Sequence, residues 1–277
     1  MNVVVRSCYL YPVKSCAGVA VDALDFDAAG EIVGDREWMI VDEQGIMTWR
    51  GAVPRLTLLQ PERAASGWRL RTADGGAVPL PPPGEGPPCT VRAWNGSRGD
   101  FDTFEGRDGG DKLAALVSQV AGRKLRAVWT ATTRHRPNPV HLTTASSLQE
   151  LARHFAVSVE RMAGHRRFRP NVVLEPAPGE TLDAFAEEKM TAFTRPSLRL
   201  IVTERCARCV VIDVDPDAAH TDERYLAGVK AHSARRFPQE PAAYFGLYAR
   251  ATAAGRLAVG DTLAVTMADA TALPRGK

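Results

Sequence analysis

The chain has 277 residues, of which 45% are hydrophobic and 24% are charged. Its formal net charge of +3 is too small to favour a nucleic acid partner, and no apolar run approaches the ~18 residues that a membrane helix needs. The N-terminus lacks the basic leader and the long apolar core of a signal peptide, so we expect a cytoplasmic protein without a membrane partner. Five unevenly spaced cysteines are typical of free thiols rather than of a disulfide framework.

The first hundred residues are predicted to be mostly β-strand. The segment "NVVVRSCYLYPV" begins with β-branched and aromatic residues and stops at Pro12, as strands often do. The segments "REWMIVDEQGIMTWR" and "GWRLRTADGGAVPL" each indicate two strands around a tight turn, at Gln44-Gly45 and at Asp74-Gly75. The proline-rich run 79–88 predicts an exposed loop, after which "CTVRAW" resumes the strand pattern.

Two helices are predicted in the middle of the chain. In "DKLAALVSQVAG" four apolar residues recur at i, i+3, i+4 and i+7, and Gly122 follows where a helix-ending glycine belongs. In "SLQELARHF" the pair Ser147 and Glu150 has the spacing of a capping box. Beyond them, "FRPNVVLE", "LRLIV" and "CVVIDV" are predicted strands, "TDERYLAGVKAHSARRF" is a predicted helix, and "YFGLYAR" and "GRLAVGDTLAV" are predicted closing strands.

Short recurrent strands with few helices predict a β-rich α+β fold with barrel character. No regular alternation of strand and helix is present, which argues against a doubly wound nucleotide-binding sheet. The segment "TATTRHRPNP" between the two middle helices breaks the pattern. We therefore predict two domains, residues 1–125 and residues 126–277.

Three segments indicate anion binding, each with an ordinary alternative. In "YPVKSCAG", Lys14 and Ser15 follow a strand, so one point charge and one hydroxyl are available for a phosphate; a solvated turn explains them as well. Arg36, in "GDREWMIVD", is either an anion clamp or one half of a surface ion pair. The three arginines of "HRRFRPNVVLE" repel one another unless an anion or carboxylates lie among them, so an anion site and a solvated basic rim both remain open.

The segment "ERCARCVVIDVDPD" places Cys206 and Cys209 three residues apart. A structural zinc site needs a second pair of ligands, and no second such motif is present. A redox dithiol belongs at a strand-to-helix junction, whereas an apolar run follows here. A single reactive cysteine is compatible with the neighbouring arginines, which lower a thiol pKa, and two buried core cysteines remain the default. Spacing alone does not decide among these alternatives.

Taken in order, five segments resemble the MOSC proteins, which comprise an N-terminal MOSC β-barrel domain and the MOSC domain proper. They are "YPVKSCAG", "GDREWMIVDEQGIMTWR", "FRPNVVLE", "CARCVVIDVDPD" and "FGLYA" with "AVGDTLAV", and together they span nearly the whole chain. The resemblance implies a molybdenum cofactor (Mo-molybdopterin) site. In the amidoxime-reducing branch of the family, the second cysteine of the motif is the metal ligand and catalytic residue, which corresponds to Cys209. The cofactor-binding positions correspond to Lys14, Ser15, Arg36, Arg169, Ala207 and Tyr248, with alanine at a position where this branch usually has serine.

The resemblance therefore implies a molybdenum-dependent reductase of N-hydroxylated compounds such as amidoximes, hydroxylamines and N-hydroxylated bases. A separate electron-transfer protein, either ferredoxin-like or cytochrome b5-like with its reductase, would supply the electrons. One alternative is a non-catalytic carrier of the molybdenum cofactor or of sulphur, with Cys209 as the acceptor thiol. Another is a binding module without a metal, in which Cys206 and Cys209 are plain core residues.

Overall fold

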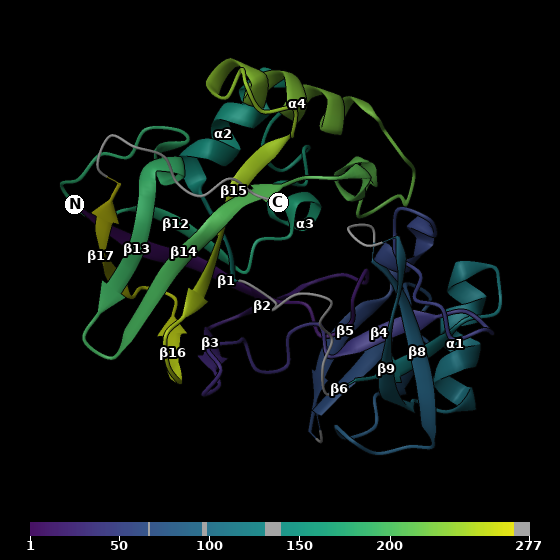
Figure 1. Ribbon diagram of the computed structural model, residues 1–277. Coiled ribbons are helices and arrows are strands. Elements are labelled where there is room, and N and C mark those ends of the chain that lie inside the picture. The colour runs from purple at the N-terminus through teal and green to yellow at the C-terminus, as the bar shows by residue number, and fades with distance from the viewer. Residues whose placement is uncertain (66, 96–98, 131–139, 269–277) are drawn as a thin grey trace.

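The computed structural model describes residues 1–65, 67–95, 99–130 and 140–268. Its largest element is an eight-stranded sheet in which the first and seventh strands of the order also pair with each other. This additional pairing closes seven strands into a barrel, which lies on the left in Figure 1. In spatial order the ring comprises β12 (Val172–Pro176), β11 (Val140–Thr144), β15 (Tyr244–Ala251), β14 (Leu198–Ala207), β13 (Met190–Arg195), β17 (Thr262–Met267) and β1 (Asn2–Leu10), and β2 (Val19–Val21) extends it beyond β1.

The first strand of the chain closes this barrel. β1 pairs antiparallel with β12, with Val5 opposite Leu174, and antiparallel with β17, with Val3 opposite Leu263. A bulge between Val5 and Ser7 shifts the register, so that Val3, Val5 and Cys8 all face the barrel core. Strand β1, drawn in purple in Figure 1, therefore lies among strands that the chain forms more than 160 residues later.

Most residues between Glu37 and Thr130 form a second body, on the right in Figure 1. It comprises a four-stranded sheet of β4 (Trp38–Val41), β10 (Arg126–Trp129), β9 (Asp100–Asp108) and β8 (Pro88–Asn95), a three-stranded sheet of β5 (Gln60–Ala64), β6 (Gly67–Arg71) and β7 (Ala77–Pro79), and helix α1 (Asp111–Ala121). Helix α1 covers these sheets with Leu113, Leu116 and Val117, which share a core with Trp38 and Leu70. Gly122 ends the helix at φ +71°, as predicted, because glycine adopts this left-handed conformation without steric cost.

Three helices pack outside the barrel and enclose a third apolar core. They are α2 (Ala145–His154), α3 (Gly164–Phe168) and α4 (Arg224–Arg236), and α2 and α4 lie above the barrel in Figure 1. A small ribbon of β3 (Ala23–Phe26) and β16 (Gly255–Ala258) completes the fold. No helix of the described residues is long and apolar enough to cross a membrane.

The predicted β-rich α+β class is confirmed, and three local predictions are wrong. β14 ends at Ala207, and Val210–Asp213 forms a short 3-10 helix, so "CVVIDV" is not a strand. Thr144, rather than Ser147, caps α2, because its hydroxyl accepts a hydrogen bond from the Ser147 backbone N–H at 3.2 Å. The turn at Gly45 forms, but its second arm makes only isolated bridges, at Ile46 and Met47.

The division at residue 125 stays a prediction, because pairing crosses it in both directions. β1 joins the barrel, and β10, which begins at Arg126, pairs with β4 and β9. The predicted break "TATTRHRPNP" lies outside the described residues except for Thr130. All five cysteines are free.

Candidate functional site

A cavity of about 510 Å³ lies between the two bodies of the molecule. All seven residues predicted for the site line it, although they come from five separate stretches of the sequence. These residues are Lys14, Ser15, Arg36, Arg169, Ala207, Cys209 and Tyr248. The sequence did not single out eight further residues that line it: Met47, Trp49, Arg50, Trp94, His141, Phe168, Arg208 and Val211. The structure thus brings the whole predicted set together.

Cys209 is the exposed cysteine of the chain, whereas Cys206 is fully buried. The strand that carries Cys206 ends at Ala207, and the Arg208 backbone N–H donates to the carbonyl of Ala243 at 2.7 Å. Cys209 then begins a short 3-10 helix, and its carbonyl accepts from Ile212 N–H at 3.1 Å. The thiol therefore lies on a loop whose backbone is held on both sides.

The two cysteines have different surroundings. The Arg208 guanidinium donates to the Cys206 sulphur at 2.8 Å and to the Phe168 carbonyl at 2.7 Å. The Coulomb interaction with Cys206, then burial, raises the pKa of Tyr248 far above its usual value, so its hydroxyl stays protonated. Among the described residues, no group of three or more His, Cys, Asp or Glu side chains could hold a metal ion. A zinc ion bound by Cys206 and Cys209, one of the open alternatives, would therefore lack further protein ligands within the described part of the chain.

Three of the predicted residues have left-handed backbone conformations. The φ angles are +74° at Ser15, +57° at Arg36 and +57° at Arg169. Such a conformation costs a non-glycine residue about 1 kcal/mol, and it persists only where the surroundings fix it. The Arg36 N–H donates to the Tyr11 carbonyl at 2.7 Å and the Arg169 N–H to the His165 carbonyl at 2.8 Å. Three side chains that line the cavity are therefore presented by strained backbone.

Tyr11, a residue that the sequence did not indicate, contacts two of the arginines through its ring. Its ring lies 4.8 Å from the Arg36 guanidinium carbon and 4.2 Å from that of Arg169. Its hydroxyl donates to the Pro170 carbonyl at 2.9 Å, and burial raises its pKa. Arg36 also pairs with the buried carboxylate of Asp35. One aromatic ring thus makes favourable cation–π contacts with two like charges at the wall of the cavity.

The pKa values of Lys14 and Arg169 lie below their usual values. Burial and the nearby Arg36 charge lower the pKa of Lys14 to about 8, and its Nζ lies 3.2 Å from the Met47 sulphur. Burial lowers the pKa of Arg169 to about 10, although the Tyr11 ring opposes this effect. Both shifts have the direction expected of cations that lack a counter-ion.

Arg50 is the most informative residue that sequence reasoning missed. It is 1% exposed, and its Nε and Nη2 donate to the Val211 carbonyl at 3.2 and 2.8 Å, while Nη2 also donates to the Arg167 carbonyl at 3.0 Å. Its Nη1 is buried and has no partner within the described part of the chain. Burial, then the Arg169 charge, lowers its pKa well below the usual value. A single arginine after a predicted strand gives no sequence signal of this position.

The charged side chains that line the cavity, among the described residues, are all basic. Lys14, Arg36, Arg50, Arg169 and Arg208 line it, and none of its described lining residues is acidic. Burial lowers the pKa of His141, which also lines it, well below the usual value, so that side chain is neutral. The basic groups exceed the one buried carboxylate beside them, that of Asp35, which pairs with Arg36. This arrangement fits a ligand that carries negative charge.

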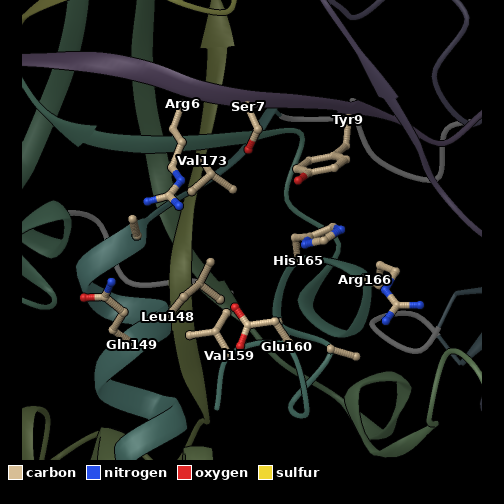
Figure 2. Close-up of a pocket in the computed structure, with 13 residues that line it drawn as sticks. Arg6, Ser7, Tyr9, Leu148, Gln149, Val159, Glu160, His165, Arg166 and Val173 are labelled. Carbon is tan, nitrogen blue, oxygen red and sulfur yellow. The ribbon is translucent and has the colours of Figure 1, made fainter.

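A second cavity, of about 340 Å³, lies between β1, α2 and α3 and is drawn in Figure 2. Figure 2 shows the rings of Tyr9 and His165 face to face at one side of it, and their centroids are 4.5 Å apart. Its arginines already have partners, because Arg6 pairs with Glu175 and Arg166 with Asp217. None of the predicted site residues lines this cavity.

Comparison with known proteins finds two matches to domain models along the chain. Residues 2–124 match the model of the MOSC N-terminal beta barrel domain, and residues 130–264 match that of the MOSC domain. The chain belongs to the MOSC family. Among MOSC relatives, mitochondrial amidoxime-reducing component 1 of Mus musculus is 25% identical over 93% of this chain and 80% of its own length.

Two further MOSC relatives give the same picture. Mitochondrial amidoxime reducing component 2 of Homo sapiens is 26% identical over 93% of this chain and 82% of its own length. Molybdenum cofactor sulfurase of Bos taurus is 27% identical over 79% of this chain, but that stretch is 28% of the sulfurase. The predicted family is thus confirmed, at an identity that leaves the reaction itself open.

Proposed function

We propose that this MOSC protein is a molybdenum cofactor-dependent oxidoreductase that reduces N-hydroxylated compounds, among them amidoximes, hydroxylamines and N-hydroxylated bases. The observation that carries the proposal is the cavity lined by Cys209, which combines one exposed thiol with five basic side chains and, among the described residues, has no acidic lining residue. The names of the amidoxime-reducing relatives support the substrate class.

The lining residues fit a molybdopterin. Lys14, Ser15, Arg36 and Arg169 would hold its phosphate, because one ammonium, one hydroxyl and two guanidiniums surround one space. Its dithiolene sulphurs and the Cys209 thiolate form a soft donor set for molybdenum. When bound, the metal would supply the two-electron chemistry that removes the hydroxyl oxygen from the substrate nitrogen.

The remaining contributions come from the chain itself. The Arg50 hydrogen bonds to the Val211 carbonyl fix the loop that presents Cys209. Tyr248 and His141 are both uncharged at neutral pH, so the positive charge of the cavity comes from its lysine and arginine side chains. Ala207 adds backbone and a methyl group to the wall, where a serine would add a hydroxyl. Electrons would come from a separate protein, ferredoxin-like or cytochrome b5-like.

A second candidate is a non-catalytic carrier of the cofactor or of sulphur. The exposed Cys209 thiol and the similarity to molybdenum cofactor sulfurase support it. In that case Cys209 would accept a sulphur atom, and the cavity would bind the cofactor without turnover.

One experiment separates these functions. The protein is purified from a molybdenum-competent host, its molybdenum and pterin are measured together with the Mo(V) paramagnetic signal, and benzamidoxime is supplied with a chemical electron donor. We expect stoichiometric metal and reduction to benzamidine. Bound cofactor without turnover would favour the carrier, and a metal-free, pterin-free protein would refute both functions.

The two cysteines give the matched pair of variants. Cys209→Ser should lose activity by at least ~100-fold, because a metal ligand is removed. Cys206→Ser should retain most of it, because a serine oxygen still accepts from Arg208. The opposite ranking would refute the assignment of Cys209 as the ligand.

A further inference from the structure

Two tryptophans are exposed at the mouth of the Cys209 cavity. Trp49 is 37% exposed and Trp94 is 55% exposed, and they are the only exposed Phe, Trp or Tyr side chains of the described residues. Both line the same cavity as Cys209, although 45 positions separate them in the sequence. Large exposed aromatic rings are unfavourable in water, and their concentration at one cavity indicates a binding surface.

The ring of Trp49 is held in place rather than free to rotate. A Cβ atom added at Gly51 would lie 2.2 Å from Cζ3 of Trp49 and 2.6 Å from its Cη2. The ring therefore lies directly against the glycine backbone, in space that any side chain at position 51 would occupy. Backbone hydrogen bonds from Ala52 and Val53 to the Trp49 carbonyl, both 2.9 Å, fix this turn.

The ring of Trp94 is supported by the neighbouring strand β9. Its ring meets Phe101 edge-on, with centroids 5.2 Å apart and an interplanar angle of 72°. The Arg92 guanidinium in turn lies 4.5 Å from the Phe101 ring centroid. Trp94 lies on β8 and Phe101 lies directly opposite it on the paired strand β9. Trp94 is thus exposed on a rigid support, as a preformed binding surface requires.

We propose that Trp49 and Trp94 determine specificity by stacking on flat aromatic substrates at the mouth of the cavity. This inference rests on the proposed function, which it narrows to N-hydroxylated compounds whose reacting group is attached to an aromatic or heteroaromatic ring. A planar ring gains dispersion and quadrupole contacts with indole that a short alkyl group does not. The basic interior is left for the cofactor, since neither tryptophan carries a charge.

The test compares two amidoximes that share the reacting group. Benzamidoxime carries an aromatic ring and acetamidoxime a methyl group. With the cofactor-loaded protein and a chemical electron donor, we expect Trp49→Ala and Trp94→Ala each to raise KM for benzamidoxime about tenfold. KM for acetamidoxime should change less than about twofold, because that substrate has no ring to stack. Trp49→Phe and Trp94→Phe should restore most of the loss, and Val259→Ala, an exposed apolar residue outside the cavity, should change neither constant.

Binding is measured separately from turnover, by calorimetric titration of benzamidoxime into the oxidised protein without an electron donor. Weaker binding in the alanine variants supports the stacking surface even if the loaded protein reduces neither amidoxime, a result that would refute only the proposed function. Equal effects on both amidoximes, or no effect on either, would overturn the inference. So would alanine variants that slow turnover with a protein electron donor alone, since the tryptophans would then bind the redox partner.

Discussion

Arg50 shows how much one buried charge constrains the ligand. Its guanidinium has backbone carbonyls as partners, its Nη1 has none within the described residues, and Arg169 and Arg208 add further positive charge nearby. A buried cation without a carboxylate is costly, so an anion in the cavity would relieve the repulsion. The free energy of unfolding of the cofactor-free protein should therefore depend on small anions.

This argument predicts a specific stabilisation by sulfate. At ~10 mM sulfate we expect the Tm of the cofactor-free protein to rise by about 3 °C over chloride at equal ionic strength, because a ligand of the native state alone stabilises it. Arg50→Met should lose most of that increase, whereas Arg55→Met, an exposed arginine on the same segment, should keep it. Scanning fluorimetry measures both, and equal increases in all three proteins would contradict the role of Arg50.

Lys14 predicts how anion binding depends on pH. Burial and the Arg36 charge lower its pKa to about 8, so the amine is charged below pH 8 and neutral above it. Calorimetric sulfate affinity of the cofactor-free protein should be constant from pH 6.5 to about 7.5 and should fall up to about tenfold per pH unit above 8. Lys14→Arg should keep its affinity up to pH 9, since a guanidinium stays charged. A wild-type affinity that is independent of pH would exclude Lys14 from the anion site.

At the scale of elements, the sequence predicted what depends on local pattern. The α1 helix and its Gly122 cap, the β1 strand and the hairpin around Gly75 all follow from periodicity and turn chemistry. The strand predicted after Cys209 is wrong, because a β-branched run favours strand when only local pattern is considered. In the structure, Arg50 and Arg167 bind the carbonyls of Val211 and Ile212 and hold the chain in a 3-10 turn. The site residues Lys14, Arg36 and Arg169 were found through the family resemblance, because spacing alone left their alternatives open.

A buried carboxylate in the 3-10 helix Ala186–Lys189 lies against the start of α2, and its protonation should control stability. Glu187 is 1% exposed and accepts from the hydroxyls of Ser147 at 2.8 Å and Thr144 at 3.1 Å, the latter being the helix cap. Burial raises its pKa to about 7, so the native state holds a proton that the unfolded state has already lost. The stability that Glu187 contributes is therefore full below pH ~4.5 and falls as pH rises to about 7.

Glu187→Gln tests this linkage, because the amide keeps an acceptor oxygen and cannot ionise. The free energy of unfolding of the wild type, measured with urea, should fall relative to the variant by roughly 3 kcal/mol between pH 4 and pH 8. Glu43→Gln, at an exposed carboxylate that pairs with Lys124 on the surface, should follow the wild type at both pH values. Parallel curves for wild type and Glu187→Gln would show that the carboxylate has an ordinary pKa.

At the scale of the whole molecule, β1 ties the N-terminus to the last strands of the chain. It fills the position between β12 and β17, and without it both strands would be open edges. No local pattern predicts these two pairings, because β12 and β17 both lie more than 160 residues after β1. The segments that match the two MOSC domain models, residues 2–124 and 130–264, are thus separate in the sequence but share one barrel in the structure.

This topology predicts which fragment folds. Residues 126–268 alone should show no cooperative urea transition, because the barrel lacks one of its seven strands. The same fragment followed by a ~6-residue Gly-Ser linker and residues 2–10 should regain one, since β17 and β1 are antiparallel and Asn2 lies opposite Ala264, which places the start of β1 beside the end of β17. Val5→Asp in the added strand should abolish the gain, because Val5 faces the barrel core, whereas Arg6→Asp, at an exposed position of the same strand, should preserve it. A cooperative transition in residues 126–268 without the added strand would mean that the barrel closes by another pairing, and that the predicted boundary at residue 125 separates two self-sufficient domains.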